Sequence, residues 1–168
     1  MRDPNEGKVS LGTGRRQVIA IADCGFRIGE FRLRIADWGL RIGGGAGYPV
    51  VMNAEEFKNR AKAFALRVIR LVEALPKSRT ADVIGRQLLR CGTSVGANYR
   101  AACRAKSTAD FVAKMAIVEE EGDEAIYWME LLVEAGLMDE QQVADLKTEA
   151  NEIVSMVVAS IKTARSRK

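Results

Sequence analysis

The sequence of 168 residues contains no histidine. This absence excludes Ser-His-Asp and Cys-His nucleophile pairs, histidine-ligated zinc, and the Glu-x-x-His di-iron sites of helical bundles. Aromatic residues make up only 6% of the chain, and there are three prolines. No apolar run is long enough to cross a bilayer, and the first residues lack the apolar centre of a secretion signal. We therefore expect a cytoplasmic protein without a membrane segment.

Cysteine is also scarce. The chain has three cysteines, Cys24, Cys91 and Cys103, which is an odd number. Their spacing is not that of a metal site. Cys91 and Cys103 fall on a helical pattern, which is typical of small buried residues in a reducing compartment. The cysteines therefore predict neither a disulfide framework nor a metal centre.

The acidic run "EEEGDE", residues 119–124, is the feature that most invites an enzymatic interpretation. On a helix it would pair Glu119 with Asp123 and Glu120 with Glu124, and such pairs bind divalent cations weakly or act as acid and base when buried. Most of these positions avoid the apolar face, and no histidine completes a ligand set. The sequence therefore predicts no catalytic residue, no metal, no cofactor and no small-molecule substrate.

Residues 1–51 differ in composition from the rest of the chain. "IADCGFRIGE", from Ile21, recurs almost unchanged as "IADWGLRIGG", from Ile35, and a glycine-rich stretch follows. The alternation in "FRLRIADW" favours a small hairpin. The alternative is a translated upstream DNA repeat, with Met52 as the natural start. In either case we expect a disordered or irregular N-terminal extension outside the folded domain.

From Met52 onwards, apolar residues recur every three or four positions, which predicts four helices. Pro76 ends the first run, and the second helix begins near Thr80. "STAD", residues 107–110, is a capping box for the third helix. Gly136 is suited to end that helix and Asp139 to begin the fourth. The predicted apolar faces are Phe57, Ala61, Phe64, Val68, Leu71, Val72 and Leu75, then Ile84, Leu88, Cys91, Val95, Tyr99 and Ala102, then Phe111, Met115, Val118, Gly122, Ala125, Ile126, Met129, Leu132 and Val133, then Val143, Leu146, Ala150, Ile153, Val154, Val157 and Ile161.

Connections this short force neighbouring helices to run antiparallel. The fold class is therefore predicted to be all-α, an antiparallel up-down-up-down four-helix bundle formed by residues 52–168.

The second helix carries two further stripes besides its apolar face. The small-residue strip comprises Gly85, Gly92, Gly96 and Cys103, next to Tyr99. Each glycine costs about 1 kcal/mol relative to alanine inside a helix, and close approach of another helix can offset this cost. That helix could belong to the same bundle or to a second subunit. The opposite face carries the arginine stripe, which comprises Arg79, Arg86, Arg90, Arg100 and Arg104.

Charge is segregated along the chain. Residues 52–106 hold twelve Lys and Arg against four acids, whereas residues 107–152 hold two Lys against thirteen acids. In one interpretation the oppositely charged helices lie side by side and pair across their exposed edges, within or between subunits. In the other, the arginine stripe is unpaired and binds the phosphates of RNA or DNA. No aromatic residues for base stacking interleave the stripe.

The chain resembles the four-helix-bundle proteins encoded within intervening sequences of bacterial 23S ribosomal RNA genes. The residues that carry the resemblance are Gln87, Arg90, Ser94, Val95, Asn98 and Tyr99 in "RQLLRCGTSVGANYRAA", with Phe111 and the stretch of residues 114–138. The resemblance extends from Met52 to Ile161. The similar family includes ring-forming homopentamers, and it is related to the accessory protein of diversity-generating retroelements, a basic pentamer that binds nucleic acid and reverse transcriptase.

This resemblance implies a self-assembling bundle, a homopentamer, without established enzymatic activity. Together with the charge pattern, it leads us to expect a non-enzymatic protein that binds RNA or DNA through the arginine stripe. The alternative is a structural or protein-interaction scaffold whose charged faces pair between subunits.

Overall fold

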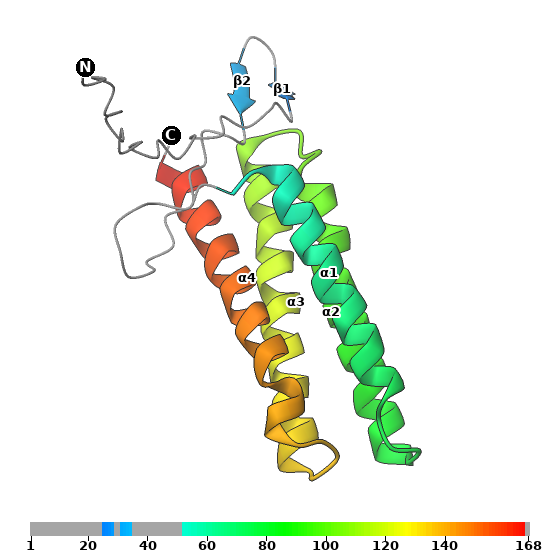
Figure 1. Ribbon diagram of the computed structural model, residues 1–168. Helices are drawn as coiled ribbons and strands as arrows, with labels where there is room; N and C mark the ends of the chain where they lie inside the picture. Colours follow the sequence, from blue (N-terminus) through cyan, green and yellow to red (C-terminus); the bar gives the residue numbers. More distant parts are fainter. Residues whose placement is uncertain (1–24, 29–30, 35–51, 167–168) are drawn as a thin grey trace, which may run out of the picture.

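The computed structural model describes residues 25–28, 31–34 and 52–166, with side chains described from residue 52 onwards. Its elements are β1 (Gly25–Ile28), β2 (Phe31–Arg34), α1 (Ala54–Glu73), α2 (Arg79–Ala102), α3 (Thr108–Glu134) and α4 (Glu140–Ser166). The four helices alternate in direction and lie side by side as an up-down-up-down bundle (Figure 1). The predicted fold class is confirmed.

The N-terminal extension contains a small hairpin formed by β1 and β2, in line with the first of its two interpretations. β1 and β2 pair antiparallel, with Phe26 opposite Leu33 and Arg27 opposite Arg32. The remainder of the expected N-terminal extension lies outside the described residues.

Side chains near the loops define where each helix begins. Asn53 caps α1 with a complete capping box, because its side chain accepts from the Glu56 N–H at 2.7 Å while Glu56 accepts from the Asn53 N–H at 3.0 Å. Ser78 caps α2 by accepting from the Ala81 N–H at 3.1 Å. The capping box of Asn53 was not predicted, although Asn53 and Glu56 have the spacing that such a box requires.

The caps of α3 and α4 differ in part from their predicted form. Ser107 accepts from the Asp110 N–H at 3.1 Å, as a capping box requires. The Asp110 carboxylate, however, accepts from the Lys106 N–H at 2.8 Å and not from Ser107, so the predicted box is only half formed. At α4, the Asp139 N–H donates to the Gln142 side chain at 2.9 Å.

Gly136 ends α3, as predicted. Its φ of 65° lies in the left-handed region that glycine adopts without strain. The Gly136 N–H donates to the Val133 carbonyl, and the Leu137 N–H donates to the Leu132 carbonyl, both at 2.9 Å. These two bonds form a Schellman motif, and they turn the chain directly into α4.

The core runs along the axis of the bundle. Most predicted apolar positions are buried, and those at the margins, such as Val72, Ile126 and Val154, are half-buried. Met156 and Ala164 of α4 are buried without having been predicted. Helices that are adjacent along the chain pack closely, whereas α1 and α4, which also face each other, make fewer contacts. None of the helices within residues 52–166 has the length and apolar character needed to cross a bilayer.

Candidate nucleic-acid interface

The small-residue strip lies against α1 of the same chain. A Cβ atom added to Gly92 would lie 2.8 Å from both γ-methyl carbons of Val68, and one added to Gly85 would lie 2.9 Å from Cδ1 of Leu75. Gly85 and Gly92 are buried. The strip was expected to contact a helix of the same bundle or of a second subunit. At these two glycines the contact is with a helix of the same bundle.

The strip continues toward the C-terminal end of α2 with more space. A Cβ atom on Gly96 would lie 3.6 Å from the Ala61 carbonyl oxygen, which is an ordinary contact. Tyr99 is buried, and its ring centroid lies 4.1 Å from that of Phe57 on α1. Cys103 is the half-buried C-cap of α2. Close approach of α1 and α2 thus extends along most of both helices.

Arg90, at the centre of the arginine stripe, pairs with two acids of α3. Its Nη1 lies 3.2 Å from each carboxylate oxygen of Glu121, and its Nη2 donates to Glu124. Burial raises the pKa of the Glu121 carboxyl, and the neighbouring Arg90 charge opposes that rise. The nucleic-acid hypothesis expected an unpaired Arg90, and the structure contradicts this expectation because α3 supplies two carboxylates at the same level.

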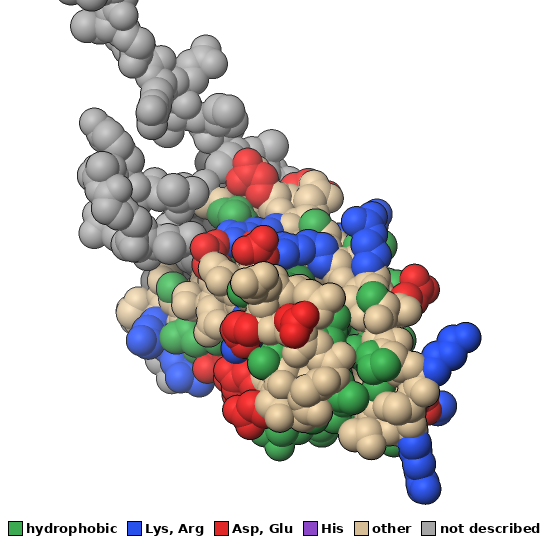
Figure 2. All heavy atoms as spheres, turned by 60° about the horizontal axis from the view of Figure 1, so that its bottom comes forward, with side chains coloured by type: hydrophobic (Ala, Val, Ile, Leu, Met, Phe, Trp, Pro, Cys, Tyr) green, Lys and Arg blue, Asp and Glu red, His purple; other side chains and the backbone are tan. Residues whose placement is uncertain are grey.

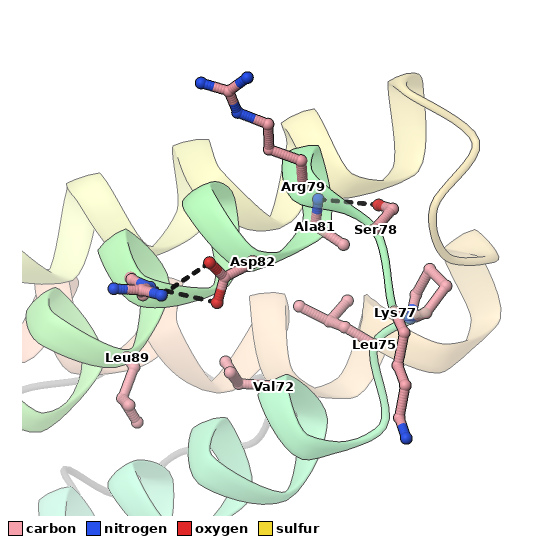
Figure 3. Close-up of a pocket in the computed structure, with 10 residues that line it drawn as sticks. Val72, Leu75, Lys77, Ser78, Arg79, Ala81, Asp82 and Leu89 are labelled. Carbon is pink, nitrogen blue, oxygen red and sulfur yellow. Dashed lines mark hydrogen bonds and ion pairs between the residues drawn. The ribbon is translucent and has the colours of Figure 1, made fainter.

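Arg86 is also paired, but locally. Its Nε and Nη2 donate to the Asp82 carboxylate at 3.1 and 2.8 Å. Both residues line an open hollow of about 570 Å³ between the end of α1 and the start of α2. Lys77 and Arg79 also line the hollow, but Figure 3 shows that their side chains point in opposite directions. The hollow therefore does not gather these cations around one point.

Three members of the stripe remain available. Arg79, Arg100 and Arg104 are exposed, and none of them forms an ion pair with another residue of 52–166. Arg79 is the first residue of α2, whereas Arg100 and Arg104 lie at its other end. The structure thus divides the stripe into two unpaired ends and a neutralised middle.

A cation of α1 joins one of these ends. Gly96 faces Ala61, and the next residue after Ala61 is the exposed Lys62. Arg100 lies one turn beyond Gly96 on α2, so the helix contact brings Lys62 and Arg100 to the same exposed edge of the α1–α2 pair. We name Lys62, Arg100 and Arg104 the basic face. The sequence analysis missed Lys62, although its position directly after a core alanine was a usable signal.

The α1–α4 edge is closed by a second bridging arginine. Nε of Arg60 lies 2.6 Å from Oε1 of Glu149, Nη2 lies 3.0 Å from Oε2, and Glu152 accepts from Nη2 as well. These contacts and those of Arg90 match the interpretation in which oppositely charged helices pair across their edges. Here the pairing occurs within one chain.

The acidic residues of α3 belong to a different helix from the residues of the basic face. Figure 2, which brings the Gly136 end of the bundle forward, shows Asp and Glu side chains spread over this end and several Lys and Arg side chains projecting from its right-hand edge. α3 also exposes Tyr127, at 52%, and Ile117, at 41%. Within residues 52–166, no three or more carboxylates or thiols are grouped as a metal ion would require.

An apolar patch crosses the α2–α3 seam. Arg90 faces Glu121, so Val83, two turns earlier on α2, is level with Trp128, two turns later on α3. Val83 is 53% exposed, and the Tyr127 ring packs edge-on against Trp128 with centroids 5.1 Å apart. We name Val83, Tyr127 and Trp128 the seam patch.

Comparison with known proteins identifies the family of the bundle. A family model described as 23S rRNA-intervening sequence protein matches residues 55–159, which is the bundle without its last turns. The chain belongs to this family. The match begins two residues after Asn53, the N-cap of α1.

A solved structure gives the same result. The bundle is similar to the crystal structure of a protein with unknown function from the S23 ribosomal protein family of Bacteroides thetaiotaomicron VPI-5482, with 34% identity and a TM-score of 0.62. The similarity covers 66% of this chain and 99% of that one. None of the curated proteins matches the chain.

Proposed function

We propose that this family member is a non-enzymatic, self-assembling bundle that binds RNA or DNA through the basic face, with Arg79 as a further contact. The observation that carries the proposal is the exposure of these cations from two helices without an ion pair among residues 52–166. Forked arginine donors suit phosphate oxygens. Arg86 and Arg90 are assigned to intrachain pairs and leave the proposed site.

A charge-reversal experiment tests this proposal. Arg100→Glu with Arg104→Glu is compared with Lys162→Glu and Arg165→Glu, two exposed cations of α4, which change the net charge equally. Binding of a mixed RNA pool at low salt is measured by fluorescence anisotropy. We expect the α2 variant to lose binding and the α4 variant to retain it. If both variants lost binding equally, the effect would be due to net charge and the proposed site would be wrong. Absence of binding by the unaltered chain would overturn the proposal.

The second candidate is a scaffold that assembles through the seam patch. Its support is the exposure of Val83 and Tyr127 on adjoining helices, because apolar side chains that gather at one place on a surface mark contact sites. The expected assembly is the ring of five subunits that the family resemblance implies. An apolar contact of this kind would persist at high salt, whereas a contact made by charged faces would dissociate.

Light scattering after sizing chromatography tests the scaffold. Val83→Glu and Tyr127→Glu should yield monomers, whereas Leu66→Glu, at an apolar position of α1 that is 45% exposed, should leave the assembly intact. A monomeric unaltered chain would contradict self-assembly, and an assembly that survives both seam variants would exclude the seam patch as its contact.

A further inference from the structure

We infer that the nucleic acid bound by the basic face is double-stranded and is held along its sugar–phosphate backbone. This inference rests on the proposed function and adds the class of ligand. Three independent features of the described residues support it: the absence of a stacking surface, the spacing of the unpaired cations, and the rigidity of the helix that carries them.

The basic side of the bundle offers no exposed ring to a base. The aromatic residues of α1 and α2 are Phe57, Phe64 and Tyr99, and their exposed fractions are 5%, 1% and 6%. Tyr127 is exposed, but it belongs to α3, whose acidic residues repel a phosphate backbone. Proteins that bind single strands gain about 1–3 kcal/mol per base from stacking on aromatic rings. A surface without them favours a ligand whose bases are already stacked on each other.

The unpaired cations of α2 form two groups. Arg79 and Arg100 are separated by most of the helix, which corresponds to about 32 Å at 1.5 Å per residue. A B-form DNA duplex presents the same side of its backbone again after one turn, at about 34 Å. Between these points the strands turn away from a straight helix lying alongside. The neutralised middle of α2, where Arg86 and Arg90 pair with acids, falls in that interval.

The spacing is fixed by the packing of α2. On one side of α2, Gly92 packs against Val68 of α1. On the other side, Arg90 forms an ion pair with Glu121 of α3. A rigid pair of contacts suits a stiff duplex of matching repeat, whereas a flexible strand gains little from a fixed separation. Contacts of this kind read the backbone and not the base sequence.

The number of contacts predicts the salt dependence. Lys62, Arg79, Arg100 and Arg104 would neutralise up to four phosphates, which gives a slope of about −3 to −4 for the logarithm of the binding constant against that of the salt concentration. Arg79→Gln should reduce this slope by about one on a duplex long enough to reach both ends of α2.

The test uses the full chain and fluorescence anisotropy at low salt. The probes are duplex RNA and duplex DNA of about two helical turns, duplexes of under one turn, at about 10 base pairs per turn, and an unstructured single strand of the same length. We expect the long DNA duplex, whose helical repeat matches the spacing of Arg79 and Arg100, to bind at least about tenfold more tightly than the single strand, a difference of about 1.4 kcal/mol. Arg79→Gln should weaken binding of the long DNA duplex and leave the short one unchanged.

The outcomes separate this inference from the proposed function. If the single strand binds as tightly as the duplex, and this binding is lost on reversal of Arg100 and Arg104, the duplex inference is wrong. The proposal of nucleic-acid binding would then still hold. An equal effect of Arg79→Gln on long and short duplexes also overturns it, because the two ends would then not act together. Failure of every probe to bind overturns both proposals.

Discussion

The guanidinium of Arg90 on α2 and the carboxylate of Glu121 on α3 face each other across the seam of the bundle, with Nη1 3.2 Å from both oxygens. Arg90→Glu would place like charges together and is expected to lower the melting temperature, as is Glu121→Arg. The combination should recover part of the loss, because opposite charges again meet across the seam. Thermal unfolding followed by circular dichroism measures all three.

Arg86→Glu is the matched control for this pair. Arg86 is 77% exposed and forms its ion pair with Asp82, one turn away on the same helix, so its reversal should lower the melting temperature less than Arg90→Glu. If the losses of the two single α2–α3 variants simply added in the double variant, Arg90 and Glu121 would not interact.

Gly92→Ala is expected to destabilise the bundle, whereas Gly96→Ala is not. The methyl group added at Gly92 would meet both Val68 methyls at 2.8 Å. Because a β-branched side chain yields little, we expect a loss of about 1–3 kcal/mol in the free energy of unfolding. At Gly96 the nearest atom is 3.6 Å away, so alanine should be neutral or should stabilise by about 0.5–1 kcal/mol. Urea unfolding checks both, and a stabilising Gly92→Ala would show that α1 and α2 are not held at this distance.

Cys91 should be inert to thiol reagents in the native protein. Burial raises the pKa of its thiol from 9.0 to about 12. The half-buried Cys103 is expected to react before Cys91 at mildly alkaline pH, and peptide mapping by mass spectrometry separates the two sites. Equal labelling rates in the absence of denaturant would contradict the burial of Cys91.

The same thiol links stability to alkaline pH. Its folded pKa exceeds the unfolded value, so its contribution is complete below pH 9 and is lost as the pH rises toward 12. Cys91→Ala should therefore unfold with a shallower decline in melting temperature over that interval, although at neutral pH its smaller side chain lowers stability. If melting temperature declined with pH equally steeply in Cys91→Ala and in the unaltered chain, the Cys91 thiol would not be the cause of the decline.

Asp110 is expected to stabilise the start of α3 at neutral pH and not in acid. Hydrogen bonds from the Lys114 side chain and the Lys106 N–H lower the pKa of its carboxyl. Stability from this group is therefore present above the ordinary aspartate pKa and is lost as the pH falls through the lowered one. Asp110→Asn should melt below the unaltered chain at pH 7 and converge with it in acid. Asp123→Asn, at an exposed position of α3 without an ion pair among residues 52–166, serves as the control.

Most of the fold could be read from the sequence because local rules determine it. Apolar periodicity located the four helices, and Pro76, Ser107 and Gly136 marked three of their ends. The partner of the Asp110 carboxylate was mispredicted, because a backbone N–H just before the cap competed for the same oxygen. Met156 was missed, since an unbranched side chain fills gaps that strict periodicity does not identify.

The candidate site was less predictable, because it depends on which helices become neighbours. Arg90 and Glu121 are separated by 31 residues, and the sequence alone allowed Arg90 to face either acids or solvent. The small-residue strip around Gly92 predicted a close helix contact but not the residue on the other side. That residue is Val68 of α1, which only the structure identifies. Lys62 joined the basic face for the same reason, through the contact of its neighbour Ala61 with Gly96.

The alternating directions of the helices place the beginning of α1 and the end of α2 at the same end of the bundle, opposite the Gly136 turn (Figure 1). Any segment joined ahead of Asn53 is therefore tethered beside Arg100 and Arg104, whatever conformation it takes. Tethering over a short linker produces millimolar effective concentrations. A ligand for the basic face that is fused at this end should consequently compete with free nucleic acid far better than the same ligand added in solution.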